Sequence, residues 1–163
     1  MSQAYIQASE LERVLLDPSD DSSFVVIDVR SSDFVGGNIP NALNLTTDKF
    51  STPSKTERVI SQYILPRTPD LKLVIVHCMR SQTRGPYVAH QLAHSPALPE
   101  GVEVKILKGG YQGWYRTYRG RAELFENLDQ SERNEWEKVV QAKEGDREEA
   151  EDSRVLRERL GRT

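Results

Sequence analysis

The sequence has very little cysteine, and this excludes a fold held together by disulfides. Cys78 is the one cysteine among 163 residues, so no internal disulfide can form. A reducing compartment fits such a chain best. The sequence also lacks an apolar run of about 18 residues, the length that a membrane-spanning helix requires, so no membrane partner is expected. Residues 1–12 lack the charged start and apolar stretch of a secretory signal, and we expect a cytoplasmic protein that can also enter the nucleus.

Neither sign of charge dominates the chain. The 22 basic and 25 acidic side chains leave a formal net charge of −3 at pH 7, which gives no reason to expect a nucleic-acid partner. The length corresponds to roughly one domain, which can bury a core without a structural metal. Basic residues that gather locally must therefore be explained by a site.

Short apolar runs rich in Val and Ile alternate with helical patterns. The runs predict buried strands, and the segments between them carry apolar residues at helical spacing. The predicted strands cover 24–29, 42–45, 71–77 and 102–107, and the predicted helices start at Ser9, cover 56–65, start at Gly85-Pro86 and cover 111–118. This alternation predicts an α/β fold of three layers, in which helices flank a central parallel sheet.

Two further features concern the ends of this pattern. Ser9 and Glu12 have the spacing of a capping box, so Ser9 is predicted to be the N-cap of the first helix. From Arg119 onward, charged residues become dense and glycine and proline become rare. One packed helix is expected within 132–141, and 144–163 is expected to be a solvated terminal helix, with a partner-binding helix as the alternative.

The segment from His77 to Pro86 carries the chemistry. Cys78 ends a predicted buried strand, five residues follow it, and Arg84 stands just before a helix. Ligands of open α/β sheets bind beyond the carboxyl ends of the strands, so the motif and the fold indicate the same place. A loop of this length can curl so that its backbone N–H groups form an anion-binding nest, to which the following helix adds the positive end of its dipole.

Such a nest suits a tetrahedral oxyanion, phosphate or arsenate. Arg84 can hold two oxygens with its planar fork, and the same field stabilises a thiolate on Cys78. A thiolate below a bound phosphoryl group is placed for in-line attack, and the loop amides can stabilise the charge of the transition state. Cys78 and Arg84 are therefore the predicted catalytic residues. The predicted oxyanion-binding residues are Met79, Arg80, Ser81, Gln82, Thr83 and Arg84.

Each residue of this segment also has a structural interpretation. A lone cysteine at a strand end is commonly a buried structural residue, and the arginine, the small polar loop and the helix start are what favour a nucleophile. His77 is predicted to support the loop through a hydrogen bond. Ser81 and Thr83 either donate to the thiolate or substrate, or are plain polar loop residues. Arg80 is expected to face solvent, where it could recruit a charged substrate.

Other polar residues have the chemistry for metal binding or acid catalysis. His90 and His94 have metal-ligand spacing, but no third ligand is evident nearby, so no metal site is expected. Asp28 ends the first strong strand and is predicted to support the site structurally, by accepting N–H groups or pairing with an arginine. A phosphatase needs a general acid for its leaving group, and the candidates are Asp28, Asp33 and Glu103.

Three segments resemble the rhodanese-like superfamily. Residues 26–30 (Val-Ile-Asp-Val-Arg), with 34–39 and 42–44, resemble its first signature, and 107–111 with Trp114 resemble its closing signature. His77-Cys78-x5-Arg84 resembles the active-site loop of the mitosis-inducing dual-specificity phosphatases and of the fungal arsenate reductases related to them. The resemblance implies one rhodanese-like catalytic domain over 5–118, followed by a charged, largely helical C-terminal extension over 119–163.

The resemblance implies that Cys78 is the nucleophile and Arg84 the oxyanion clamp. Sulfur-transferring rhodaneses carry a loop one residue shorter, so the implied ligand is a four-oxygen anion. Unlike the mitotic phosphatases, this chain has no acidic residue in the loop and no second cysteine, which argues against a mitotic role. The continuation Arg84-Gly85-Pro86 is similar to the fungal reductases and small fungal phosphatases.

We expect a cysteine-dependent phosphatase of the protein-tyrosine or dual-specificity type. It would form a phosphocysteine, need no metal or organic cofactor, and act on a phosphorylated protein or a small oxyanion. The alternative is an arsenate reductase, which with a single cysteine must take its electrons from glutathione and glutaredoxin. Further alternatives are a thiosulfate-type sulfurtransferase and a non-catalytic rhodanese module that binds partners through the charged tail.

Overall fold

A five-stranded parallel sheet forms the centre of the computed structural model, which describes residues 4–128. The strand order is β1-β5-β4-β2-β3, and all four neighbouring pairs are parallel. The strands are β1 (Tyr5–Ile6), β2 (Phe24–Asp28), β3 (Leu43–Asn44), β4 (Leu73–His77) and β5 (Glu103–Leu107). The helices are α1 (Ala8–Leu16), α2 (Pro53–Val59), α3 (Arg84–Ala93) and α4 (Gly110–Tyr118). Short helical turns lie at Pro18–Asp20, Thr47–Phe50, Ile60–Ile64, Leu65–Arg67 and Ala122–Leu124.

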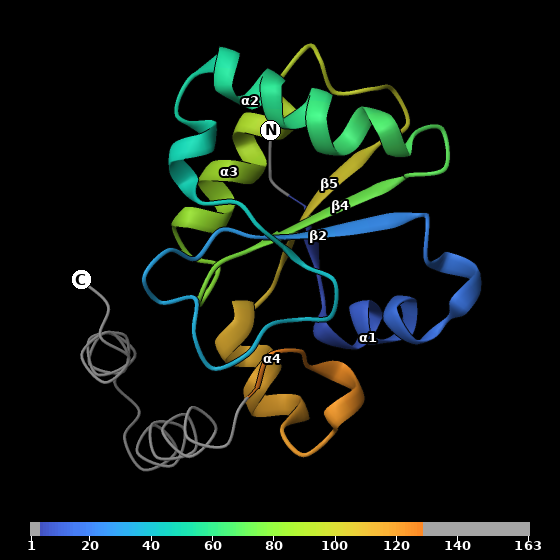
Figure 1. The fold of residues 1–163 in the computed structure, drawn as a ribbon, viewed down its shortest axis with the longest axis vertical. Helices are drawn as coiled ribbons and strands as arrows, with labels where there is room; N and C mark the ends of the chain where they lie inside the picture. Colours follow the sequence, from blue (N-terminus) through green and yellow to red (C-terminus); the bar gives the residue numbers. More distant parts are fainter. Residues whose placement is uncertain (1–3, 129–163) are drawn as a thin grey trace.

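Helices cover both faces of the sheet, as the alternation of strands and helices predicted. α1 and α4 lie on one face, and α2 and α3 lie on the other (Figure 1). Side chains of β2 alternate between these layers: Val26 packs with the first pair of helices, and Val25 and Ile27 pack with the second. The predicted three-layer α/β fold is confirmed.

Two helix starts differ from the prediction. α1 begins at Ala8, and the Gln7 N–H donates to Glu10 Oε1 at 3.0 Å, so the prediction that Ser9 caps this helix was wrong. The physical reason is β1, a two-residue strand that ends at Ile6. The residue that follows it, Gln7, is therefore the N-cap, two residues before the predicted Ser9. Similarly, α2 begins at Pro53 instead of residue 56, because the Thr52 hydroxyl accepts the Lys55 N–H at 3.2 Å.

The chain beyond α4 stays attached to the domain as far as the structure describes it. Leu124 and Phe125 join the core, the Trp114 indole donates to the Leu124 carbonyl at 3.0 Å, and Asn38 pairs with Glu126. The predicted helices within 132–163 lie outside the described residues. Among residues 4–128, no helix is long and apolar enough to cross a membrane.

The sheet topology brings two loops together. The chain leaves β2 toward β3 on one side and leaves β4 toward β5 on the other, so the loops after β2 and β4 flank a crevice at the carboxyl edge of the sheet. The first loop contains Asp33, and the second contains residues 78–83. Any site built from both loops must therefore lie at this edge.

Candidate active site

Cys78 follows directly on β4 and is almost completely buried. Its residue surface is 3% exposed, and the backbone N–H of Gly85 donates to its Sγ at 3.3 Å. Gly85 lies in the first turn of α3, so the amino end of that helix faces the sulfur. The donor to the sulfur is thus a backbone amide. Ser81 Oγ, a predicted donor, has no hydrogen-bond partner among the described residues.

Most backbone amides of the loop after Cys78 make no hydrogen bond with a described residue. Ser81 adopts a left-handed conformation with φ 56°, which curls the loop between β4 and α3. Within residues 4–128 no hydrogen bond engages the backbone N–H groups of Met79, Ser81, Gln82, Thr83 and Arg84. The Met79 side chain packs in the core, so its contribution to a ligand site is limited to its amide. Amides without a partner among residues 4–128 are what an anion nest requires, and anion binding by this loop stays a prediction.

The amino end of α4 braces the loop from behind. The N–H groups of Tyr111 and Gln112 donate to the carbonyls of Cys78 and Met79 at 3.0 and 2.8 Å. These carbonyls approach so closely that only glycine fits at position 110. A Cβ on Gly110 would lie 2.6 Å from the Met79 oxygen and 2.7 Å from the Cys78 oxygen. Its φ of 60° also favours glycine, so this residue fixes the contact between helix and loop.

Arg84 is held by a carboxylate from the opposite loop. Its Nη1 and Nη2 donate to the two Asp33 oxygens at 2.9 and 2.7 Å. Burial favours the neutral form of Asp33, but the pairing with Arg84 outweighs it and holds the pKa of that carboxyl below its usual value. Asp33 takes the end of the guanidinium, and the Arg84 Nε–H has no hydrogen bond to a described residue. The Nε edge is therefore open to an oxyanion while Asp33 stays bound.

Arg30 fastens the loop that carries Asp33. It is fully buried, and its Nη2 donates to Asp28 Oδ2 at 2.8 Å and to the Gly37 carbonyl at 2.9 Å. Its Nη1 donates to the Asp33 carbonyl at 3.3 Å, and its guanidinium lies 4.2 Å from the centre of the Tyr111 ring. Asp28 thus binds Arg30, and Arg30 in turn binds carbonyls of the loop, which are the contacts that a supporting role for Asp28 requires.

His77 and Asp28 form the floor below Cys78. The His77 Nδ1 lies 3.0 Å from the Cys78 carbonyl, a bond in which Nδ1 carries the proton, and Nε2 lies 3.6 Å from Asp28 Oδ2. Complete burial lowers the pKa of His77, so the imidazole is neutral at pH 7. Burial alone would raise the pKa of Asp28, but the charge and hydrogen bonds of the Arg30 guanidinium more than offset it, and the pKa lies below its usual value. The predicted hydrogen bond from His77 to the loop is present.

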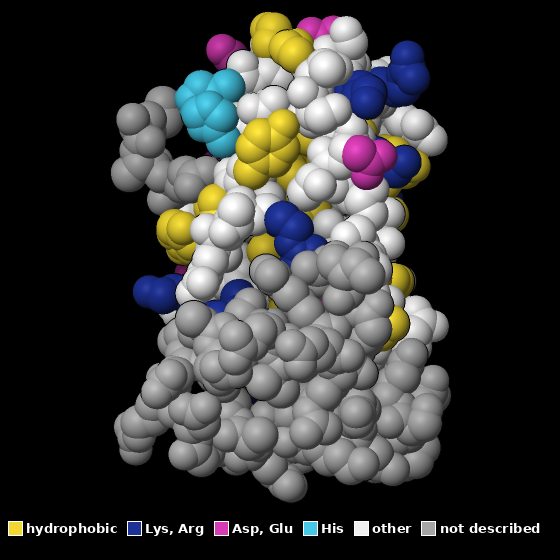
Figure 2. Space-filling model, turned by 90° about the vertical axis from the view of Figure 1, so that its left-hand side faces the viewer, with side chains coloured by type: hydrophobic (Ala, Val, Ile, Leu, Met, Phe, Trp, Pro, Cys, Tyr) yellow, Lys and Arg dark blue, Asp and Glu magenta, His cyan; other side chains and the backbone are white. Residues whose placement is uncertain are grey.

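Other sequence candidates lie elsewhere. Glu103 begins β5 at the amino edge of the sheet, so the structure does not bring it to Cys78. His90 on α3 and His94, the C-cap residue of that helix, are exposed, with ring centres 4.0 Å apart. Figure 2 shows exposed histidine side chains on one face of the molecule. No group of three metal-ligating side chains occurs in the described part of the chain.

Residues 11–117 match the model of the rhodanese-like domain. The chain belongs to the rhodanese-like domain family. Two fungal relatives carry phosphatase names. One is the CDC25-like phosphatase YCH1 of Saccharomyces cerevisiae, 30% identical over 70% of this chain and 82% of the relative. The other is the dual specificity phosphatase ibp1 of Schizosaccharomyces pombe, 28% identical over 76% of this chain and 96% of the relative.

A solved structure that is similar to this chain carries a different name. The As-Sb reductase from Leishmania major superimposes with a TM-score of 0.65 at 28% identity, covering 76% of this chain and 85% of that one. The chain is thus similar both to proteins named as phosphatases and to a protein named as an As-Sb reductase. The choice between these activities for the present chain depends on its own site.

Proposed function

We propose that the protein is a cysteine-dependent phosphatase of the protein-tyrosine or dual-specificity type. The observation that carries the proposal is the arrangement of one loop. The Cys78 thiol lies at its start against the amino end of α3, and Arg84 lies at its end. Between them, the amides of Met79, Ser81, Gln82 and Thr83 make no hydrogen bond within residues 4–128. The names of the two fungal relatives support the same activity. The expected substrate is a phosphorylated protein or a small phosphorylated molecule, encountered in the cytoplasm or nucleus.

The reaction proceeds in two displacements. The Cys78 thiolate attacks phosphorus, a sulfur–phosphorus bond forms, and the bond to the leaving oxygen breaks with its electron pair on that oxygen. Water then attacks the phosphocysteine, which releases inorganic phosphate and returns the thiolate. The loop amides and the Nε edge of Arg84 stabilise the equatorial oxygens in both steps. No metal or organic cofactor takes part in this scheme.

Arsenate reduction is the second candidate, and the reductase from Leishmania major supports it. Arsenate has the charge and shape of phosphate, so the same loop can bind it. Cys78 would become arsenylated, and glutathione and glutaredoxin would supply the two electrons that convert arsenate to arsenite. The chain has no second cysteine that could do so internally.

A paired assay separates the two activities. Purified protein is offered an aryl phosphate in one arm, and arsenate with glutathione and glutaredoxin in the other. Cys78→Ser is measured in both arms, and His90→Gln, an exposed change on α3, is the control. Phosphate release that vanadate inhibits, that Cys78→Ser abolishes and that His90→Gln keeps is the expected result. Thiol-dependent arsenate loss with slow phosphate release would replace the phosphatase by the reductase, and activity in neither arm would reject both.

A further inference from the structure

A cavity of about 430 Å³ lies beside the oxyanion loop. Three cationic side chains line it, Arg80, Lys108 and Arg116, and no acidic residue of the described chain does. A second cavity, on α2, offers a contrast, because Asp48 joins the basic residues there. The cavity beside the loop is thus a concentration of positive charge on a protein whose net charge is −3.

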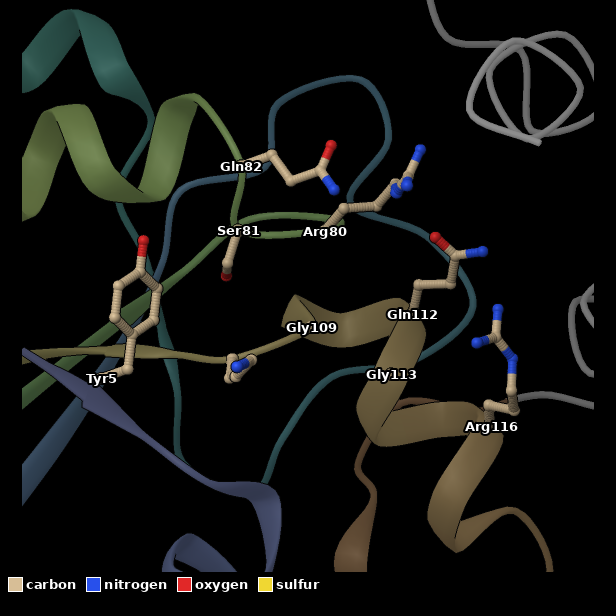
Figure 3. A pocket seen from close by; sticks show the side chains of 9 residues that line it. Tyr5, Arg80, Ser81, Gln82, Gly109, Gln112, Gly113 and Arg116 are labelled. Carbon is tan, nitrogen blue, oxygen red and sulfur yellow. The ribbon is translucent and has the colours of Figure 1, made fainter. Parts of the chain in front are cut away.

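The walls of this basic cavity come from three elements that meet at the carboxyl edge of the sheet. In Figure 3, Arg80 and Gln82 project from the loop after β4, Gln112 and Arg116 project from α4, and Tyr5 of β1 stands apart from them. The loop that holds the predicted nucleophile therefore forms one wall of the cavity. Residues of one loop thus line the basic cavity and also carry the amides of the proposed oxyanion nest.

The basic cavity lies within reach of a substrate held at Cys78. Arg80 follows Cys78 by two residues, so their Cα atoms can be no more than about 7 Å apart. Lys108 is exposed, and no described residue pairs with its ammonium group. A cleft lined by one sign of charge focuses its field and raises the local concentration of counter-ions. The cationic lining therefore favours an anionic ligand.

We propose that the basic cavity binds a second anionic group, a carboxylate or a phosphate, carried by the same substrate molecule as the scissile phosphate. The inference rests on the proposed phosphatase function and names the substrate class of that site. An extended peptide advances by about 3.5 Å per residue, so a side chain one or two positions from a phosphorylated residue spans the distance to the cavity. A small molecule with two phosphates can span the same distance.

The test compares probes that differ in the second charge alone. One pair consists of phosphotyrosine peptides flanked on both sides by Glu or by Gln. The other pair consists of an aryl bisphosphate and the matching aryl monophosphate. We expect kcat/KM to be about tenfold higher for the doubly anionic member of at least one pair, and the ratio to shrink as salt is added. The pair that shows the ratio identifies the substrate as a peptide or a small molecule.

Two substitutions test whether the cavity causes this preference, measured as the ratio of kcat/KM between the doubly anionic probe and its partner. Lys108→Gln should lower it about threefold to fivefold, and Lys108→Gln with Arg116→Gln should bring it close to one. Arg58→Gln removes the same charge from the exposed face of α2, far from the cavity lining, and should keep the wild-type ratio.

The outcomes separate this proposal from the one on which it rests. Turnover with ratios near one for both pairs, or an equal fall in Arg58→Gln, would overturn the second-anion site and leave the phosphatase standing. Lack of turnover of every probe by folded protein would reject the phosphatase, and the second-anion site would fall with it.

Discussion

Replacement of Asp33 by asparagine should weaken catalysis through Arg84. The carboxylate makes two charge-assisted hydrogen bonds to the guanidinium, and its side chain is 4% exposed against 29% for Arg84. Asparagine keeps the shape, but its amide nitrogen cannot accept, so one of the two bonds is lost. A hydrogen bond to a charged group is worth about 1.5–3 kcal/mol, and a loss of about 2 kcal/mol in the transition state lowers kcat/KM about 30-fold.

We expect Asp33 to position Arg84 and not to donate a proton, and a series of leaving groups tests this expectation. The pKa of Asp33 lies below its usual value, so the carboxyl is ionised at neutral pH and has no proton to give. A series of aryl phosphates with increasingly basic phenols is offered to wild type and to Asp33→Asn. The 30-fold loss should be the same throughout the series, and Asp33→Glu should recover part of it.

Asp70→Asn serves as the control, because Asp70 is an exposed acid that makes no hydrogen bond or ion pair with a described residue. A loss in Asp33→Asn that grows with the basicity of the phenol would refute the positioning role and make Asp33 the general acid.

Stability gives an independent check on the ion pair between Asp33 and Arg84. Because the folded pKa is depressed, the pair stabilises the fold above about pH 4, and that contribution disappears as the pH falls further. The difference in unfolding free energy between wild type and Asp33→Asn should therefore shrink below pH 4.

Three further predictions concern the frame of the site. Gly110→Ala should cost at least about 3 kcal/mol in urea unfolding and abolish activity, because its Cβ meets two loop carbonyls, whereas Gly101→Ala, with φ 87° and no atom within 4 Å of its Cβ, should cost only about 1–2 kcal/mol. The melting temperature should fall as the pH drops below about 6.5, the ordinary pKa of histidine, because His77 has a lowered pKa in the fold and the unfolded chain binds the proton first. His77→Asn should flatten this slope, and His90→Gln should keep it. Arg30→Ala should destabilise by about 3–5 kcal/mol, because it leaves a buried carboxylate and three carbonyls without their donor, and calorimetry measures this loss.

The main strands and the loop were predictable because their signals are local. Runs of Val and Ile marked β2, β4 and β5, and the six-residue spacing from Cys78 to Arg84 marked a nest between a strand and a helix. The two-residue strand β1 was not predictable, because half of it is exposed and it is too short to show a period. Because β1 was not predicted, the predicted start of α1 was also misplaced.

Contacts between distant segments were beyond the sequence. Asp33 was one of three acids that could serve the site, and it is the fold that places it on Arg84, 51 positions further along the chain. The same holds for the basic cavity, because Arg80 and Lys108 come together only when α4 docks on the loop. A local signal existed for one missed contact: the glycine at position 110 indicated a close backbone approach, although not its partner.

The most direct test of the account is capture of the intermediate on Cys78. The protein is mixed with an aryl phosphate, quenched with acid during the burst, digested, and mapped by mass spectrometry. We predict a phosphoryl group on the peptide that contains Cys78. This adduct should be absent from Cys78→Ser and should form more slowly in Arg84→Lys. Steady turnover without that adduct, or phosphate release that survives in Cys78→Ser, would contradict it.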